Sequence, residues 1–158
     1  MAITNADNAF GLRAIGKVGQ NRDNQGLSEY GIAASSTAIY QNDPIMMAAT
    51  GKIIVGTAAA VLLGSLNGVF YTDATNQKPT WANHLAASNT ATDIVGFVSD
   101  DPYERFEIQS DAALTVAEVG MNADIVYAAG ATPNYISKVE LDHSDLKTAT
   151  AQLRVIGI

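Results

Sequence analysis

Cysteine is absent from this chain of 158 residues, histidine occurs twice and tryptophan once. Without cysteine the chain forms neither a disulfide framework nor a thiolate metal site. Its histidines, His84 and His143, lie far apart in the sequence and outside the H-x-x-x-H spacing that directs two imidazoles at one metal ion. The sequence therefore predicts no metal site and no cofactor.

Charged residues are also scarce, at 16% of the chain, against about 25% in an average soluble domain. The nine lysines and arginines are scattered and the net charge is -7, which argues against binding the phosphate backbone of a nucleic acid. A weakly charged, alanine-rich surface is suited to contact with other proteins, because little hydration is lost when it is covered.

Long apolar runs are missing as well. The longest candidate, residues 53–66, is interrupted by Gly56 and Gly64 and falls short of the roughly 20 residues that span a bilayer. The first residues do not combine a basic stretch with an apolar run, so we expect no secretory signal. The pattern predicts a soluble protein made in a cytoplasm, with no membrane partner.

Catalytic motifs are not found either. No serine stands in a Gly-x-Ser-x-Gly elbow. Asp100, Asp101 and Glu104 place three acids within five residues, enough in principle for an acid/base pair. Adjacent acids before a proline, here Pro102, are ordinary turn residues. We therefore predict a non-enzymatic protein, with a carboxylate-dependent hydrolase as an alternative.

Most of the chain has the pattern of short β-strands separated by turn residues. Turns that contain asparagine, proline and glycine follow one another without long helical periods, which favours a compact antiparallel β-barrel or a jelly-roll-like sandwich. With a single chain of this length we expect one core. The predicted strands are Glu29–Ile32, Ile45–Met47, Lys52–Val55, Val69–Thr72, Ile94–Val98, Arg105–Ile108 and Leu153–Ile156.

Two segments depart from this pattern. Residues 110–120 begin with an N-cap candidate, Ser110, and end at Gly120, which predicts at most one short helix. Residues 73–93 read as a long loop that contains Trp81, the only tryptophan. A large aromatic residue on a long loop indicates either a contact surface or a side chain that pins the loop to the core.

The first third of the chain is unlike the rest. Residues 8–19 hold an apolar cluster among glycine and asparagine and lead into the polar residues 21–26. Such a segment cannot build its own core, so we predict an extended N-terminal arm over residues 1–28, followed by a β-domain over residues 29–158. The alternative is that the segment folds back as an extra strand on its own domain.

Several stretches resemble capsid decoration, or cement, proteins of tailed bacteriophages. The stretches that carry this resemblance are Asn8–Arg13, Ala38–Ile45, Leu62–Gly64, Asn67–Tyr71, Val119–Asp124, Ile136–Asp142 and Gln152–Gly157.

The resemblance implies a structural virion protein, made in the host cytoplasm, that binds the outer surface of the capsid. Such a protein stabilises the head shell by clamping neighbouring subunits of the major capsid protein, commonly as a homotrimer. A different class, a tail-associated or receptor-binding β-domain that contacts a host surface, is the alternative.

On this hypothesis the arm carries the contacts. Its apolar anchors are expected to be Phe10, Leu12 and Ile15, while Arg13 and Arg22 pair with carboxylates on the shell through their planar guanidinium groups. Two positions outside the arm complete the predicted interaction residues: Trp81, and the apolar terminal residue Ile158, expected in a subunit interface.

Overall fold

The computed structural model describes residues 7–19, 26–33 and 37–158, and almost all of its regular structure is β. Antiparallel pairing dominates and the arrangement is sandwich-like, so the all-β prediction is confirmed; the strands of the described residues do not close into a barrel. The strands are β1 Arg13–Lys17, β2 Ser28–Gly31, β3 Pro44–Met47, β4 Ile53–Val55, β5 Gly64–Thr72, β6 Pro79–Ala82, β7 Val95–Ser99, β8 Glu104–Glu107, β9 Asn122–Ala123, β10 Ile125–Val126, β11 Glu140–Leu141 and β12 Leu153–Arg154.

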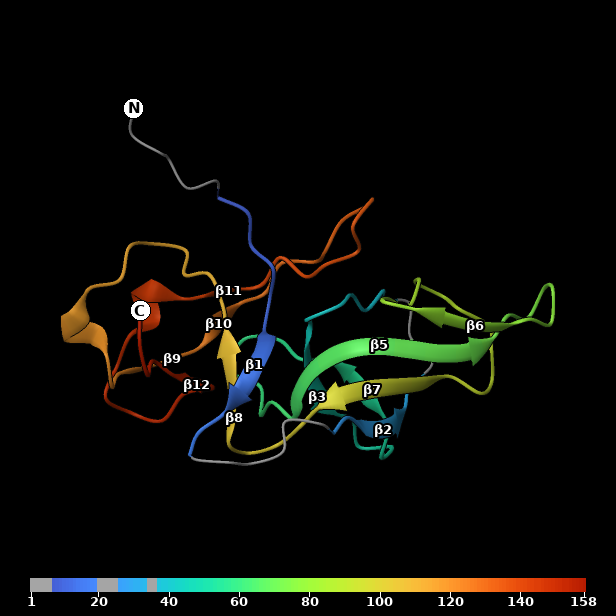
Figure 1. Ribbon diagram of the computed structural model, residues 1–158, viewed down its shortest axis with the longest axis horizontal. Coiled ribbons are helices and arrows are strands. Elements are labelled where there is room, and N and C mark those ends of the chain that lie inside the picture. The colour runs from blue at the N-terminus through green and yellow to red at the C-terminus, as the bar shows by residue number, and fades with distance from the viewer. Residues whose placement is uncertain (1–6, 20–25, 34–36) are drawn as a thin grey trace.

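The largest element is a six-stranded sheet. Five of its strands follow the order β2-β7-β5-β3-β4, and the sixth, β6, pairs with residues 69–72 at the C-terminal end of β5. The long, bent strand β5 forms its spine (Figure 1). A bulge between Leu66 and Gly68 shifts the register of β5 against β7, and a bulge bends a strand and increases its local twist. A single parallel bridge from Ile32 to Ile53 draws β4 toward the end of β2.

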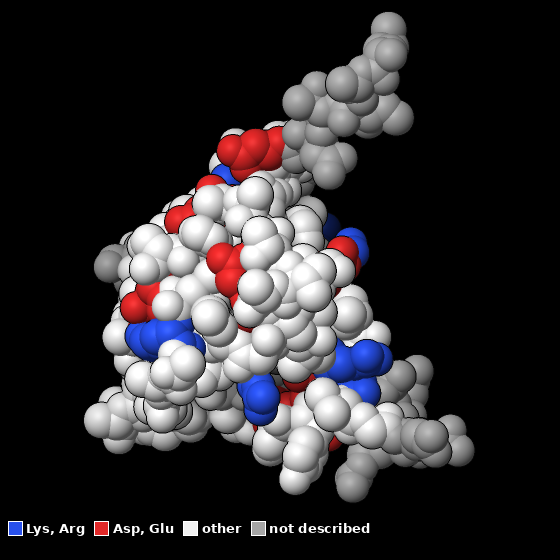
Figure 2. All heavy atoms as spheres, turned by 90° about the vertical axis from the view of Figure 1, so that its left-hand side faces the viewer, with Lys and Arg blue, Asp and Glu red and all other residues white. Residues whose placement is uncertain are grey.

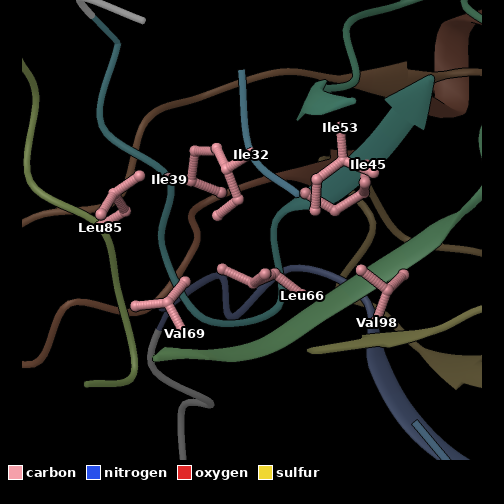
Figure 3. Packing of buried hydrophobic residues seen from close by; sticks show 8 residues of the cluster. All are labelled: Ile32, Ile39, Ile45, Ile53, Leu66, Val69, Leu85 and Val98. Carbon is pink, nitrogen blue, oxygen red and sulfur yellow. The ribbon is translucent and has the colours of Figure 1, made fainter. Parts of the chain in front are cut away.

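The main core lies on the inner face of this sheet. Leu66, Val69 and Val98 point inward, and each is fully buried. Leu66 and Val69 share this face although they are three residues apart, because the bulge between Leu66 and Gly68 interrupts the alternation of β5. Figure 3 shows these side chains converging with isoleucines from β3, β4 and the connections that follow β2. The cluster consists of Ile32, Ile39, Ile45, Ile53, Leu66, Val69, Leu85 and Val98.

A second, smaller core occupies the C-terminal region, which we define as residues 108–158. Ala123, Leu141 and Val155 form its buried centre, and its strands β9 to β12 have two residues each. The expectation of one core is therefore wrong: the sheet region, residues 28–99, and the C-terminal region bury separate clusters, with β1 and β8 between them (Figure 1).

The segment predicted as a helix is mostly irregular. Only Val116–Glu118 forms a 3₁₀ turn, η1, with Thr115 and Glu118 in a capping box. The Asp111 N–H donates to the Leu141 carbonyl oxygen at 3.1 Å. A hydrogen bond to a distant residue of the same chain therefore uses the N–H group that the N-terminus of a helix would leave unpaired. A second 3₁₀ turn, η2, spans His143–Asp145, and no helix in the described part of the chain is long and apolar enough to cross a membrane.

The predicted loop over residues 73–93 contains a strand. β6 pairs with the end of β5, so that Trp81 lies opposite Phe70. The hairpin is closed by a turn in which Asp73 accepts hydrogen bonds from the backbone of Thr75 and Asn76 at 2.8 and 3.0 Å. Among the described residues β6 pairs with β5 alone, and a proline is tolerated in an edge strand because no neighbour on the open side needs the missing N–H.

Candidate interaction surface

Residues 13–17 of the predicted arm form strand β1 and pair with β8. The alternative of a strand folded back on its own domain thus describes this segment in the structure. Within the described residues β1 has no second neighbour, so one of its edges keeps backbone groups available for another chain.

A bulge in β1 turns one apolar side chain toward solvent. The register shifts between Ala14 and Gly16, which leaves Ile15 without a cross-strand partner. Gly16 has a φ of 145°, a value that glycine adopts without strain. The Ile15 side chain is 54% exposed, and bulges characteristically redirect a side chain in this way.

The residues just before β1 are fixed to the domain. Leu12 is 1% exposed, and its N–H donates to the Asn42 carbonyl oxygen at 2.9 Å. The Asn42 side chain donates in turn to the Phe10 carbonyl oxygen at 3.0 Å. Gly11 has a φ of +72°, and a Cβ there would lie 2.4 Å from the Asn42 carbonyl oxygen. The prediction of Leu12 as an exposed anchor is therefore wrong, because its side chain belongs to the interior.

A hollow of about 800 Å³ lies between β1 and the end of the main sheet. Its apolar lining includes Phe10, Ile15, Leu27 and Ile136. Arg13 stands at its border, with its guanidinium carbon 5.1 Å from the centre of the Phe10 ring and an ion pair to Glu107. The hollow thus combines an exposed aliphatic side chain with a positioned cation.

A buried carboxyl group lies in the turn to which Leu12 is attached. Asp43 has no exposed surface, and one of its oxygens accepts the Tyr40 N–H at 2.8 Å. Burial raises the pKa of Asp43 to about 6, against the opposing effect of the Ser137 and Tyr40 hydrogen bonds. Burial, and then the Asp43 charge, raise the pKa of Tyr127 to about 12. The turn therefore carries a titratable group inside the protein.

The predicted interaction residues do not form one site. Phe10, Arg13 and Ile15 meet at the hollow, whereas Trp81 is on β6 and 66% exposed. Ile158 is 64% exposed and lies at the opposite end of the molecule from β6 (Figure 1). Arg22 lies outside the described residues.

The end of the molecule that carries Ile158 is weakly charged. Figure 2 shows small separate groups of charged side chains on an otherwise uncharged surface. Val116, Val119 and Ile156 are 79%, 41% and 56% exposed, and Val119 and Ile156 are neighbours because the adjoining Gly120 N–H donates to the Val155 carbonyl oxygen at 2.8 Å. Of these four residues, only Ile158 was predicted from the sequence as an interaction residue.

The carboxylates considered for catalysis all have structural contacts. Asp100 accepts the Ser28 and Tyr30 hydroxyls at 2.9 and 2.6 Å. Asp101 pairs with Lys17 at 2.8 Å, and Glu104 accepts the Gly16 N–H at 3.2 Å. Each of the three acids thus contacts a residue of strand β1 or β2, which is a structural role.

The two histidines lie in different regions. His84 stacks on Tyr135 at 3.8 Å, and burial lowers its pKa. His143 lies 3.1 Å from Glu118. Among the described residues no group of three or more histidine, aspartate or glutamate side chains is arranged to hold a metal ion.

Two aromatic neighbours of Trp81 were not predicted from the sequence. Phe70 and Phe97 lie 5.7 and 4.6 Å from it, between ring centroids. Each stands next to a buried valine, Val69 or Val98. This alternation of aliphatic and aromatic residues was the available signal, because period 2 places neighbours on opposite faces of a sheet.

Comparison of the chain with protein-family models, with curated proteins and with solved structures finds no match.

Proposed function

We propose that the protein is a structural virion protein that binds the outer surface of a tailed-phage capsid and clamps neighbouring major capsid subunits. The observation that carries the proposal is the hollow beside β1, where the bulge exposes Ile15 next to Arg13. An exposed apolar anchor beside a guanidinium group and an unpaired strand edge is suited to a protein partner. The resemblance to capsid decoration proteins supplies the identity of that partner.

Binding at this hollow requires no movement of the core. Ile15 enters an apolar contact on the capsid subunit, and the free edge of β1 adds main-chain hydrogen bonds. Arg13, whose side chain is 56% exposed, orients a carboxylate of the shell through its planar fork. Leu12 contributes by holding this segment on the domain.

The experiment is binding of the purified protein to undecorated heads. Ile15→Glu places a charge in the contact, and we expect affinity to fall at least about tenfold, as for an interface residue that contributes about 1.4 kcal/mol or more. Val61→Glu is the matched control, because Val61 is 90% exposed and does not line the hollow. Circular dichroism verifies that both variants fold.

Equal binding by Ile15→Glu and the control would refute the hollow as the contact. Truncation of the first 20 residues is a poorer test, because it also removes β1 and the buried Leu12. Cryo-electron microscopy of virions tests location: density on the head supports the proposal, whereas density at the tail supports the alternative of a tail-associated or receptor-binding domain.

We assign the trimer contacts to the weakly charged end defined by Val116, Val119, Ile156 and Ile158. These side chains are exposed, and contact with other copies of the chain about a symmetry axis would remove their aliphatic surface from water. Native mass spectrometry should give a trimer that Ile156→Asp dissociates. A monomeric wild-type protein would contradict this assignment and leave head binding by Ile15 to be judged separately.

A further inference from the structure

Three aromatic side chains from adjacent strands meet on the outer face of the main sheet. Phe70 on β5 lies opposite Trp81 on β6, and Phe97 on β7 lies opposite Gly68 on β5. The Trp81 and Phe97 rings are 4.6 Å apart with an interplanar angle of 24°. Because Gly68 has no side chain, the two rings meet across β5. We call Phe70, Trp81 and Phe97 the aromatic face.

This face is rigid and directed away from the core. β5 pairs with β6 on one side and β7 on the other, while the intervening residues Val69 and Val98 are fully buried on the inner side. Trp81 is nevertheless 66% exposed. Backbone pairing of β6 with β5 thus holds the indole ring in place at the surface. Little conformational entropy is then lost when a ligand binds to it.

Polar side chains adjoin the aromatic face. Glu29 on β2 lies opposite Phe97, and the exposed Asn67 lies in the bulge beside Gly68. Gly31 is two residues beyond Glu29 on the same face, and the Lys52 side chain lies 3.9 Å from the position of a Cβ there. Within the described residues no side-chain hydrogen bond or ion pair engages Glu29, Lys52 or Asn67.

We propose that the aromatic face binds a neutral saccharide. The apolar C–H face of a pyranose ring stacks on Trp81, whose indole offers a large flat surface. Phe97 covers one face of the indole, so this sugar ring takes the other face. A neighbouring sugar residue of the same saccharide extends past Phe97 toward β2, where its hydroxyl groups, which both donate and accept, bond to the acceptor Glu29, the donor Lys52 and the amide of Asn67. This inference goes beyond the proposed function and does not depend on capsid binding.

The flanking groups decide between kinds of ligand. A purely apolar partner would cover Glu29, Lys52 and Asn67 without hydrogen bonds, and each buried, unpaired group costs about 1–3 kcal/mol. Single-stranded nucleic acid also stacks on aromatic rings but requires a basic groove, whereas the chain has a net charge of -7. A saccharide satisfies both the rings and the polar border.

The sole tryptophan makes the test direct. The intrinsic fluorescence of the full chain is titrated with cellotriose, maltotriose, chitotriose and mannotriose, and we expect a saturable change in Trp81 emission with at least one of them. Saturation-transfer NMR, which needs no tryptophan, should give the same affinity for the wild type. It should show loss of binding for Trp81→Leu, which keeps apolar bulk but removes the aromatic ring.

Two further variants separate the parts of the site. Glu29→Ala should weaken binding about tenfold, the equivalent of one lost hydrogen bond of about 1.4 kcal/mol. Tyr103→Ala is the matched control, since Tyr103 is an aromatic residue 59% exposed elsewhere on the surface, and it should bind as the wild type does.

No saturable binding across the four trisaccharides would overturn the proposal, and so would equal binding by Trp81→Leu. An oligomer that Trp81→Leu dissociates would also overturn it, because a second copy of the chain would then cover the face. The measurement uses the isolated protein without heads. Its failure would therefore leave the Ile15 experiment unaffected.

Discussion

The sheet region and the C-terminal region satisfy their backbone polar groups in different ways. β5 has nine residues and pairs with β3, β6 and β7, so continuous ladders bond the backbone and flank a cluster of eight buried side chains. In the C-terminal region, ladders of two residue pairs are supplemented by side chains. Asp124 accepts the Gln152 N–H at 2.9 Å, and Asp145 accepts the Asp124 N–H at 3.0 Å.

This difference has consequences for stability. Ladder hydrogen bonds depend on the backbone and tolerate side-chain changes, provided that the core behind them stays filled. Bonds between side chains and backbone depend on individual residues, and several here involve carboxylates that Lys147 neutralises at 3.2 and 2.6 Å from Asp124 and Asp145. We expect the sheet region to respond most to core volume and the C-terminal region to respond to polar substitutions and to pH.

The largest expected effect comes from truncating one leucine in each core. Leu66→Ala, in the sheet cluster with no exposed surface, should lower the free energy of unfolding by about 3–4 kcal/mol, because transfer and cavity terms add. Leu141→Ala, 4% exposed in a cluster with only two other buried members, should cost about 2 kcal/mol, because a small core collapses more readily around the missing atoms. Urea unfolding measures both.

Hydrogen exchange then shows whether the regions unfold together. Leu141→Ala should accelerate exchange in residues 108–158 and leave the β5 amides protected, whereas Leu66→Ala should accelerate exchange throughout. Uniform acceleration of exchange by both variants would mean that the two clusters unfold as a single cooperative unit. The sheet region and the C-terminal region would then not differ in stability as expected.

The next effect is the pH dependence of two aspartates whose pKa values move in opposite directions. Burial raises the pKa of Asp43 from 3.8 to about 6. The folded state therefore holds a proton that the unfolded state releases, and the free energy of unfolding falls as pH rises between these values. The full difference is about 3 kcal/mol, since each pKa unit is equivalent to about 1.36 kcal/mol. Asp43→Asn should remove this slope and raise stability at neutral pH.

Asp145 has the opposite sign. The hydrogen bond from Lys147 lowers the pKa of its carboxyl group, so its contribution is present above the unfolded pKa and lost as pH falls through the folded pKa. Asp145→Asn should lower stability at neutral pH and remove the acid-side loss, while it leaves the slope between pH 3.8 and about 6 due to Asp43 in place. Urea unfolding over a pH series measures both variants. If the free energy of unfolding of Asp43→Asn still fell with pH as in the wild type, groups other than Asp43 would be responsible for this pH dependence.

The same contrast explains what could be predicted from sequence. Strands of the sheet region, such as β4 at Ile53–Val55, were found because β-branched residues between turn residues are a local signal. β6 was missed because Pro79 and the preceding turn residues resemble a loop, and its strand geometry depends on pairing with β5. The strands β9 to β11 carry no periodic signal, because two residues are too few for an alternating pattern.

The interaction surfaces were predictable only in part. The apolar character of residues 10–15 is visible in the sequence, but whether each side chain faces inward depends on contacts with Asn42 and on the bulge opposite Arg105. Trp81 was selected as a single residue. Its contact with Phe70 and Phe97 depends on the register between strands β5, β6 and β7, which no local pattern specifies.

The smallest expected effect tests the connection between the two regions. The Gln152 side chain donates to the carbonyl oxygens of Thr57 and Ala60 at 2.9 and 2.7 Å and accepts the Ile125 N–H at 3.0 Å. Gln152→Ala should lower the free energy of unfolding by about 1–2 kcal/mol, because it leaves a partly buried N–H unpaired. Gln77→Ala, whose bond to the Ala74 carbonyl oxygen is local and exposed, should change stability by less than about 0.5 kcal/mol.

Hydrogen exchange gives Gln152→Ala a second readout. If this side chain couples the regions, its loss should separate their exchange behaviour, with Ile125 becoming less protected while the β5 amides keep their wild-type protection. A variant that loses stability but still exchanges as one unit would place the coupling elsewhere. The main-chain continuity from β7 through β8 would then be the structural link, because β8 follows β7 directly and pairs with β1 between the two clusters.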